Sequence, residues 1–315
     1  MKKKLLALAA VFLGYAVFEN TIALTVRREK ISEGSGNTLK VAHIADLHKK
    51  RFGRGNVRLC ERVKAESPDM IIISGDIVSR TQKDLSAVRS ALEQFCRIAP
   101  VYMIFGNHEQ SLPEEKRREL LRAIAESGAV LLRNDSISVN IRGRSMNIHG
   151  LEPSYSTYKK NDSYRDLDVI TLADMERLLG KCPEGENLLI AHNPFFGEVY
   201  AEWGADYIMS GHIHGGAVRI FGVGLLSPER RFFPKNSKGI YTIGKAKLLV
   251  SAGLGKLRLF NPPEIVTYEL CTSDHECKKN KHNSSCPREI AAQRGDFFAG
   301  KRSEHHGGET RHAGE

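Results

Sequence analysis

Short apolar runs alternate with helical stretches along this chain, and the runs end in polar residues. Residues 39–45, 70–74 and 101–105 are such runs, rich in valine and isoleucine. Residues 57–66 and 85–97, which separate them, have the apolar spacing of amphipathic helices. Alternation of this kind predicts an α/β fold built on a parallel sheet.

The pattern continues through the second half of the chain. We expect a helix over 113–126 capped by Ser111, strands at 130–132, 137–141 and 146–148, a helix at 172–179, and strands at 188–191 and 207–209. Shorter β segments follow to about Leu270. These elements predict one folded domain over residues 39–270.

Side chains of the metal-ligand type follow five of these strands. They are Asp46 and His48, then Asp76, then Asn107 and His108, then His192, and finally His212 and His214. The carboxyl ends of strands line the site in an open α/β sheet, so these residues are expected to converge. One strand-end histidine is usually no more than a capped polar residue, but five such positions together favour a metal centre.

The donor types narrow the choice of metal. Apart from His108, the set contains two aspartates, one asparagine and four histidines, which offer mixed oxygen and nitrogen ligands. This set suits Mn, Fe or Zn better than calcium, which prefers oxygen alone. The absence of cysteine from the set argues against a purely structural zinc site.

In this order the motifs resemble the calcineurin-like metallophosphoesterase superfamily over about residues 39–270. They are Asp46-x-His48, Gly75-Asp76, Gly106-Asn107-His108-Glu109, His192 and Gly211-His212-x-His214. Gly-His-Ile-His-Gly-Gly at 211–216 and Asn-Pro-Pro-Glu-Ile-Val at 261–266 are most similar to the membrane-associated bacterial phosphodiesterases of the YkuE and YaeI type. The resemblance implies a four-layer α/β/β/α sandwich, two central sheets flanked by helices, around two divalent metals.

The resemblance also implies a role for each residue. Asp46, His48 and His214 would hold the first metal, Asn107, His192 and His212 the second, and Asp76 would bridge them. A hydroxide held between the metals would attack phosphorus. His108 would contact the phosphate and help to protonate the leaving oxygen, with Glu109 beside it to orient or tune the imidazole. His43 and His149 fall outside these motifs and are predicted to be core or supporting residues.

The N-terminus is apolar behind three lysines. Residues 5–18 form an uninterrupted apolar run, and residues 22–26 are apolar again after Glu19 and Asn20. A full membrane span needs roughly 20 apolar residues, so the run suits either a signal segment, weakly cleavable at 21–23, or a spanning helix over 5–26. We favour the uncleaved anchor, which predicts a single-pass protein of the bacterial cell membrane with its catalytic domain outside the cytoplasm.

These features divide the chain into four parts. We predict a membrane segment over 1–30, a linker over 31–38 that contains Glu-Gly-Ser-Gly-Asn, the catalytic domain over 39–270, and a polar, disordered tail over 271–315. The six cysteines contain no Cys-x-x-Cys pair, which argues against a dense disulfide framework.

The predicted activity is hydrolysis of a phosphodiester in a membrane lipid or envelope intermediate. A phosphomonoesterase, a nuclease and a tethered scaffold without catalysis are the alternatives. The net charge of +10 permits a nucleic-acid partner, but the surplus lies largely in the tail and flanks and a nuclease has no use for an anchor. We therefore expect a lipid-linked substrate and no nucleic acid. The basic loop at 49–54 would attract an anionic head group or remain solvated, and Tyr155, Tyr158 and Tyr164 could form pocket walls.

Overall fold

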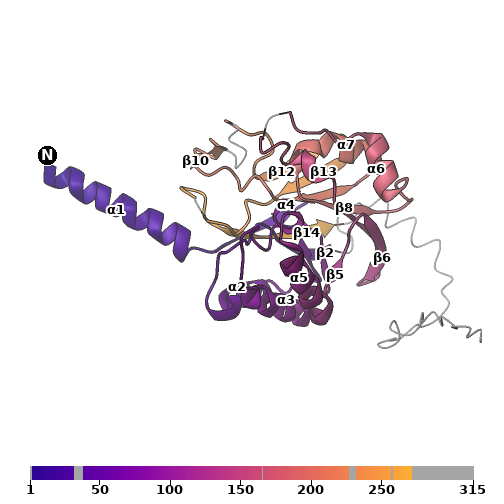
Figure 1. Cartoon of the computed structure of the whole chain (residues 1–315), viewed down its shortest axis with the longest axis horizontal. Helices are drawn as coiled ribbons and strands as arrows, with labels where there is room; N and C mark the ends of the chain where they lie inside the picture. The colour runs from indigo at the N-terminus through magenta and orange to yellow at the C-terminus, as the bar shows by residue number, and fades with distance from the viewer. Residues whose placement is uncertain (1, 32–37, 165, 227–231, 257, 272–315) are drawn as a thin grey trace, which may run out of the picture. The chain divides into compact units, whose positions relative to one another are not determined.

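The computed structural model describes residues 2–31, 38–164, 166–226, 232–256 and 258–271. These residues form two six-stranded sheets, each assembled from segments that are distant in the sequence (Figure 1). The predicted polar tail, apart from Cys271, and residues 32–37 of the predicted linker lie outside the described residues.

The first sheet is parallel except at one pair of strands. Its order is β1 (Thr25–Lys30), β14 (Glu264–Cys271), β2 (Thr38–Ile44), β3 (Met70–Ile73), β4 (Val101–Met103) and β5 (Val130–Leu131). Only β14 and β2 run antiparallel among these described strands. The parallel arrangement of β2 to β5 confirms the prediction from the alternating pattern.

The second sheet is formed by strands that lie between residues 135 and 250. Its order is β12 (Gly239–Ile243), β13 (Ala246–Val250), β9 (Tyr207–Ser210), β8 (Asn187–Ala191), β7 (Arg144–Leu151) and β6 (Asp135–Ile141). Strands β13, β9, β8 and β7 are parallel, and each edge strand is antiparallel to its neighbour. A separate two-stranded hairpin joins β10 (Arg219–Ile220) to β11 (Val223–Gly224).

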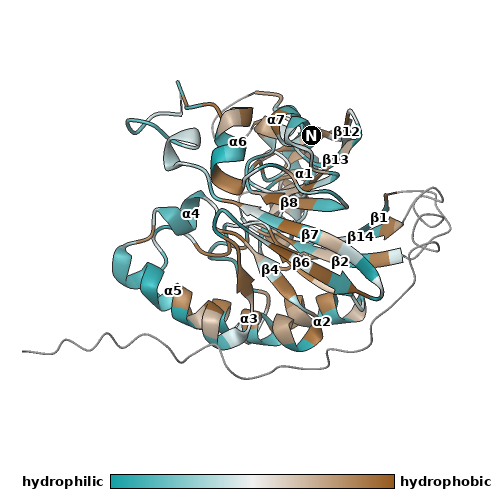
Figure 2. Ribbon diagram, turned by 90° about the vertical axis from the view of Figure 1, so that its right-hand side faces the viewer, coloured by the Kyte–Doolittle hydropathy of each residue, from teal (hydrophilic) through white to brown (hydrophobic). Residues whose placement is uncertain are grey.

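Helices cover the outer face of each sheet (Figure 2). The helices over the first sheet are α2 (Val57–Ala65), α3 (Ser86–Ile98) and α5 (Glu114–Ser127), and those over the second are α6 (Leu172–Leu179) and α7 (Gly197–Trp203). The short helix α4 (Asn107–Gln110) follows β4, and single 3₁₀ turns occupy Arg54–Asn56, Tyr155–Thr157 and Pro194–Phe196. Pro113, rather than the predicted Ser111, is the N-cap of α5.

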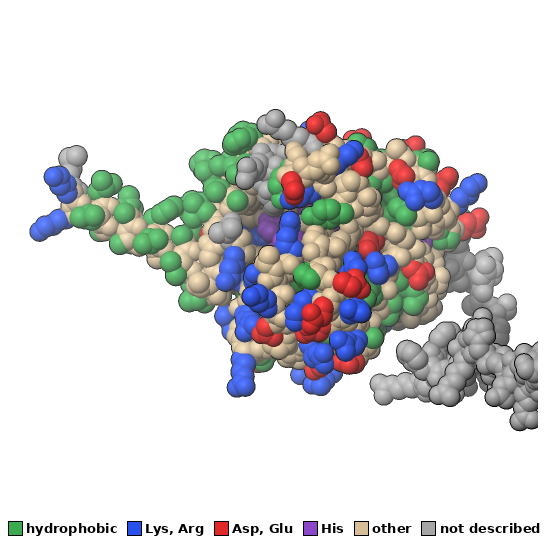
Figure 3. All heavy atoms as spheres, in the orientation of Figure 1, with side chains coloured by type: hydrophobic (Ala, Val, Ile, Leu, Met, Phe, Trp, Pro, Cys, Tyr) green, Lys and Arg blue, Asp and Glu red, His purple; other side chains and the backbone are tan. Residues whose placement is uncertain are grey.

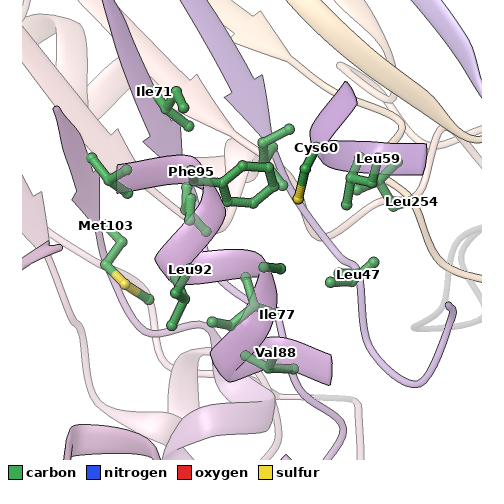
Figure 4. Packing of buried hydrophobic residues seen from close by; sticks show 14 of the residues in the cluster. Leu47, Leu59, Cys60, Ile71, Ile77, Val88, Leu92, Phe95, Met103 and Leu254 are labelled. Carbon is green, nitrogen blue, oxygen red and sulfur yellow. The ribbon is translucent and has the colours of Figure 1, made fainter. Parts of the chain in front are cut away.

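Strand β3 shows why the layers pack as they do. Because side chains alternate along a strand, Ile71 and Ile73 face the helices while Met70 and Ile72 face the second sheet. Figure 4 shows Ile71 in the same buried cluster as Phe95 and Leu92 of α3. The apolar cluster between the sheets and the two clusters under the helices make four layers, which confirms the predicted α/β/β/α sandwich.

The N-terminal prediction needs a correction. The apolar helix α1 is long and apolar enough to cross a membrane by length and composition, but it covers Lys2–Thr21 and does not continue to Val26. Residues Thr25–Lys30 form β1, which pairs with β14 along its whole length. The first sheet therefore begins at Thr25, and the predicted boundaries at 30 and 39 are wrong.

Candidate metal centre

The eight residues predicted from the sequence come together where the strands of both sheets end. Asp46 and His48 follow β2, Asp76 follows β3, Asn107 and His108 open α4 after β4, His192 follows β8, and His212 and His214 follow β9. Three overlapping groups of these residues have ligand atoms within 4.8 Å of one another. The groups are Asp46, His48 and His214; His48, Asp76 and His108; and Asp76, His192 and His212.

Asp76 lies between two sets of donors. On one side its Oδ2 atom is 3.3 Å from Nε2 of His192. On the other side it is 3.9 Å from Nε2 of His48, which is itself 3.2 Å from Nε2 of His214. His214 Nε2 is 3.4 Å from Oδ1 of Asp46. One carboxylate therefore faces both sets.

The backbone is left-handed at five of these residues. Asp46, His48, Asp76, His212 and His214 have φ between 50° and 70°. Residues other than glycine avoid this region, and each departure costs on the order of 1–3 kcal/mol. Hydrogen bonds hold the left-handed backbone in place. The amide of Asp46 donates to the Gly75 carbonyl at 3.1 Å, and that of His48 donates to the Asp76 carbonyl at 3.0 Å. The tight turns after the strands aim their side chains into one space.

Glycines allow the strand ends to approach closely. Gly75 has φ of 100°, and a Cβ atom there would lie 2.7 Å from the amide nitrogen of Gly106. A Cβ atom at Gly106 would lie 2.3 Å from Oδ1 of Asp76. Larger residues at these positions would therefore separate the β3 and β4 ends that carry Asp76 and Asn107.

Glu109 supports the backbone of the site. It is buried, and its oxygens accept the amide N–H groups of Asp76 at 2.9 Å, Val78 at 3.0 Å and Gly106 at 2.7 Å. Burial and the nearby Asp76 raise the pKa of Glu109 to about 8, against the effect of these amides. Glu109 is expected from the sequence to orient or tune the His108 imidazole, but its carboxylate binds the amides of the turn instead of the ring.

The two aspartates remain ionised in a buried position. Burial alone would raise the pKa of Asp46, but His214 and then His192 outweigh it and hold that pKa below its usual range. For Asp76 burial is likewise outweighed, chiefly by His192, and the pKa is well below its usual range. Burial opposes protonation of His192, but Asp76 and Asp46 raise its pKa to about 9. These anionic groups attract positive charge, whether it is a proton or a cation.

Other donors suit a cation better than a proton. Burial lowers the pKa of His48 to about 4, so its imidazole is neutral near pH 7, as a metal ligand must be. The Oδ1 atom of Asn107 is buried and lacks a hydrogen bond among the described residues. A buried amide oxygen without a partner is costly, and a cation would satisfy it. The donor set therefore fits divalent metal ions.

Two regions of open space, which share His108 and His214 as lining residues, reach the site. A cavity of about 430 Å³ is lined by His48, Lys49, Lys50, Ser79, His108, His214, Ala217 and Lys256. A smaller one, about 90 Å³, is lined by residues that include Asp76, Asn107 and the predicted wall residues Tyr155, Tyr158 and Tyr164. Figure 3 shows a histidine in a hollow bordered by lysine and arginine side chains near the base of α1.

Arg80 is a neighbour of His108 that the sequence pattern did not indicate. Its amide donates to Nδ1 of His108 at 3.2 Å, and its guanidinium lies 3.2 Å from Nε2. Arg80 follows Asp76 by four residues and belongs to no recognisable motif, so its position depends on how the loop after β3 turns.

The other two histidines of the described residues, His43 and His149, are core residues, as predicted. His43 lies 2.8 Å from the hydroxyl of Ser74, and His149 lies between Ser136 at 2.6 Å and Asn187 at 3.0 Å. Both are buried, and neither belongs to the metal-ligand groups found among the described residues.

Comparison with known proteins places the chain in one family. Residues 39–216 match the family described as calcineurin-like phosphoesterase. The uncharacterized metallophosphoesterase YkoQ of Bacillus subtilis is 25% identical over 81% of this chain and 94% of its own length. The phosphodiesterase YaeI of Escherichia coli is 26% identical over 73% and 82%. The UDP-2,3-diacylglucosamine pyrophosphatase LpxG of Chlamydia muridarum is 24% identical over 72% and 82%. The chain therefore belongs to the calcineurin-like phosphoesterase family and is a hydrolase of phosphoric esters.

Proposed function

We propose that the chain is a phosphodiesterase that works with two divalent metals on a phosphate ester of a membrane lipid or envelope intermediate. The observation that carries the proposal is the position of Asp76, whose carboxylate faces a histidine of each donor set at 3.3 and 3.9 Å. A carboxylate between two sets of donors is what a pair of metal ions requires.

The ligands divide into two sets around that carboxylate. Asp46, His48 and His214 would hold the first ion, Asn107, His192 and His212 the second, and Asp76 would contact both. Bound Mn, Fe or Zn would neutralise phosphoryl oxygens and provide an activated water for attack on phosphorus. Two observations support the division. All these side chains except Asn107 belong to groups whose ligand atoms lie close together. The amide oxygen of Asn107 is buried without a hydrogen bond among the described residues.

Among the chain's own groups, His108 is the proposed proton donor. It lines both the larger and the smaller space, so it is accessible to a bound ester. The Arg80 amide donates to Nδ1, so Nε2 is the nitrogen where His108 would exchange a proton with the leaving oxygen. The Arg80 guanidinium, 3.2 Å from Nε2, would have to move aside as the ester binds. Lys49, Lys50 and Lys256 line the approach and would favour an anionic substrate.

A lipid substrate is supported by where α1 joins the domain. Lys50, which lines the larger cavity, has its Nζ atom 3.4 Å from the carbonyl of Glu19 in the last turn of α1. If α1 anchors the chain in the bacterial cell membrane, the cavity opens near the bilayer surface. We favour a catalytic domain on the outer side of that membrane. Two relatives are named for related chemistry, YaeI as a phosphodiesterase and LpxG as a pyrophosphatase of a diacylated sugar nucleotide.

The reaction class can be tested with two chromogenic esters. We expect the full chain in detergent micelles with Mn²⁺ to hydrolyse bis(p-nitrophenyl) phosphate faster than p-nitrophenyl phosphate, and chelator to abolish both rates. Faster release from the monoester would instead make the chain a phosphomonoesterase. Competition by single-stranded DNA against a phospholipid diester would favour the nuclease alternative and contradict a lipid substrate.

A further inference from the structure

The last turn of α1 is hydrogen-bonded to residues 258–261. Glu19 is 1% exposed, and its carboxylate accepts the amides of Asn261 and, at 2.9 Å, Phe260. The Asn20 side chain accepts the Arg258 amide at 2.9 Å and donates to the Arg258 carbonyl at 2.7 Å. Two adjacent helix residues thus fix the backbone of a segment about 240 positions away.

The same segment holds the loop that carries His214. Arg258 is 3% exposed, and its guanidinium donates to the His214 carbonyl at 3.3 Å and to the Gly255 carbonyl at 2.6 Å. The side-chain amide of Asn261 donates to the His214 carbonyl at 2.6 Å and to the Gly216 carbonyl at 2.9 Å. Side chains whose own backbones are held by α1 therefore fix the turn at His214.

The loop that begins at Gly253 also lies directly against the ligands. A Cβ atom on Gly253 would lie 2.6 Å from Oδ2 of Asp46. A Cβ atom on Gly255 would lie 3.1 Å from the ring of His48 and 3.5 Å from that of His214. With contacts this close, a shift of the loop would displace the side chains of the first donor set.

We propose that Glu19 and Asn20 are positioning residues for the set of Asp46, His48 and His214, so that the end of α1 is a structural part of the metal centre. The proposal rests on the metal-binding role given to that set under the proposed function. Partners that orient metal ligands typically affect metal affinity by 10–100-fold. Cleavage after Ala23 would remove both residues, so α1 remains attached in the active enzyme.

Metal titration of the full chain tests this coupling. The chelator-treated protein in detergent micelles is titrated with Mn²⁺, and free Mn²⁺ is measured by electron paramagnetic resonance. We expect Asn20→Ala to weaken one of two sites by about tenfold or more and to leave the other nearly unchanged. Thr21→Ala is the matched control, because the Thr21 hydroxyl donates to the Val17 carbonyl within α1. It should bind both ions as the wild type does.

A second pair of variants separates positioning from general loss of structure. Asn20→Asp keeps an acceptor for the Arg258 amide but cannot donate to the Arg258 carbonyl. Its Mn²⁺ affinity at the affected site should therefore lie between those of the wild type and Asn20→Ala. Asn20→Asp also replaces Asn20→Ala in the test if Asn20→Ala does not fold. His214→Ala should weaken the same site, and adding Asn20→Ala to it should have little further effect.

The outcomes distinguish this inference from the function on which it rests. Two wild-type sites with unchanged affinities in Asn20→Ala, or additive effects of Asn20→Ala and His214→Ala, would overturn the positioning role and leave the dimetal function standing. A folded wild-type chain that binds no Mn²⁺, Fe²⁺ or Zn²⁺ would overturn both.

Discussion

At the scale of single residues, the metal centre is a balance of buried charges. Asp46 and Asp76 are essentially unexposed, yet each keeps a lowered pKa because imidazoles surround it. The energetic cost of two nearby buried carboxylates falls when positive charge lies between them. The same side chains that are costly to bury in the free protein therefore become favourable once cations are bound.

A variant of His108 distinguishes its two possible roles, metal ligand and proton donor. We expect His108→Ala to lower kcat for the diester by about 10²–10⁴-fold, the usual contribution of a positioned acid. The bound metal, measured by elemental analysis of the purified variant, should stay at the wild-type amount. Loss of an ion together with the activity would mean that His108 is a ligand, as its grouping with His48 and Asp76 would allow.

Glu264 gives a prediction for stability against pH. It is 1% exposed and bonded to Arg27 and Lys238. Burial alone would raise its pKa, but Lys238 and Arg27 outweigh it and lower the value. A lowered folded-state pKa means that this stabilisation is complete above the unfolded value of about 4.3 and is lost as the pH falls through the lower folded value.

We therefore expect Glu264→Gln to lower the free energy of unfolding by about 3–5 kcal/mol at pH 7, because it removes the buried carboxylate that pairs with Lys238 and with Arg27. The deficit should begin to shrink below about pH 4.3, where the carboxyl group is protonated in the unfolded chain, and should continue to shrink as the pH falls through the lower folded-state pKa. Urea unfolding at both pH values, followed by Trp203 fluorescence, measures the difference. Glu29→Gln, which removes the more exposed partner of Arg27, should cost about 0–1 kcal/mol. An equal deficit for Glu264→Gln at both pH values would contradict the charge argument.

At the scale of elements, the β10–β11 hairpin is unusual in presenting apolar side chains to solvent. Ile220, Val223 and above all Phe221, which is fully exposed, lie on it. The hairpin starts beside α1, because the Arg219 amide donates to the Leu259 carbonyl at 3.0 Å and the next residue, Phe260, stacks on Tyr15 of α1. Exposed apolar residues next to a helix that is long and apolar enough to cross a membrane would suit the bilayer interface.

A tryptophan probe tests the position of the hairpin. In phosphatidylcholine vesicles that contain brominated lipid, we expect the added emission of Phe221→Trp to be quenched strongly. Ser138→Trp on β6, at the opposite end of the domain from α1 in Figure 1, should not be quenched. Equal quenching of the two positions, or none, would show that this face does not contact the bilayer.

The elements that sequence reasoning predicted are those with strong periodicity. The helix at Leu172–Leu179 agrees at both ends, and the strands before Asp46, Asp76 and His192 agree to within two residues. The site residues could be predicted because parallel strands place the residues at their ends along one edge of the sheet. Its residues could thus be found from local patterns alone.

The failures concern pairing between distant segments. Strand β1 reads Thr-Val-Arg-Arg-Glu-Lys and has no apolar run, because it lies at the edge of its sheet and is stabilised by pairing with β14. Glu19 and Asn20 looked like polar interruptions of a spanning helix, and their partners at 258–261 could not be recognised from spacing. The support given by Glu109 to three amides depends on the turn geometry and was missed for the same reason.

At the scale of the whole molecule, the centre requires both sheets. Asp46, His48, Asp76 and Asn107 come from the first sheet, whereas His192, His212 and His214 come from the second. The two ends of the described chain also meet, since β1 pairs with β14 and α1 holds the segment before β14. Folding, attachment of α1 and assembly of the metal site are therefore expected to be one cooperative event.

The metal content of the purified full chain tests the central claim most directly. After dialysis against Mn²⁺ and removal of free ion, elemental analysis should find two ions per wild-type chain and at most one in Asp76→Ala, with circular dichroism showing that the variant is folded. One ion or none in the wild type, or two ions retained by Asp76→Ala, would contradict a dimetal centre bridged by Asp76.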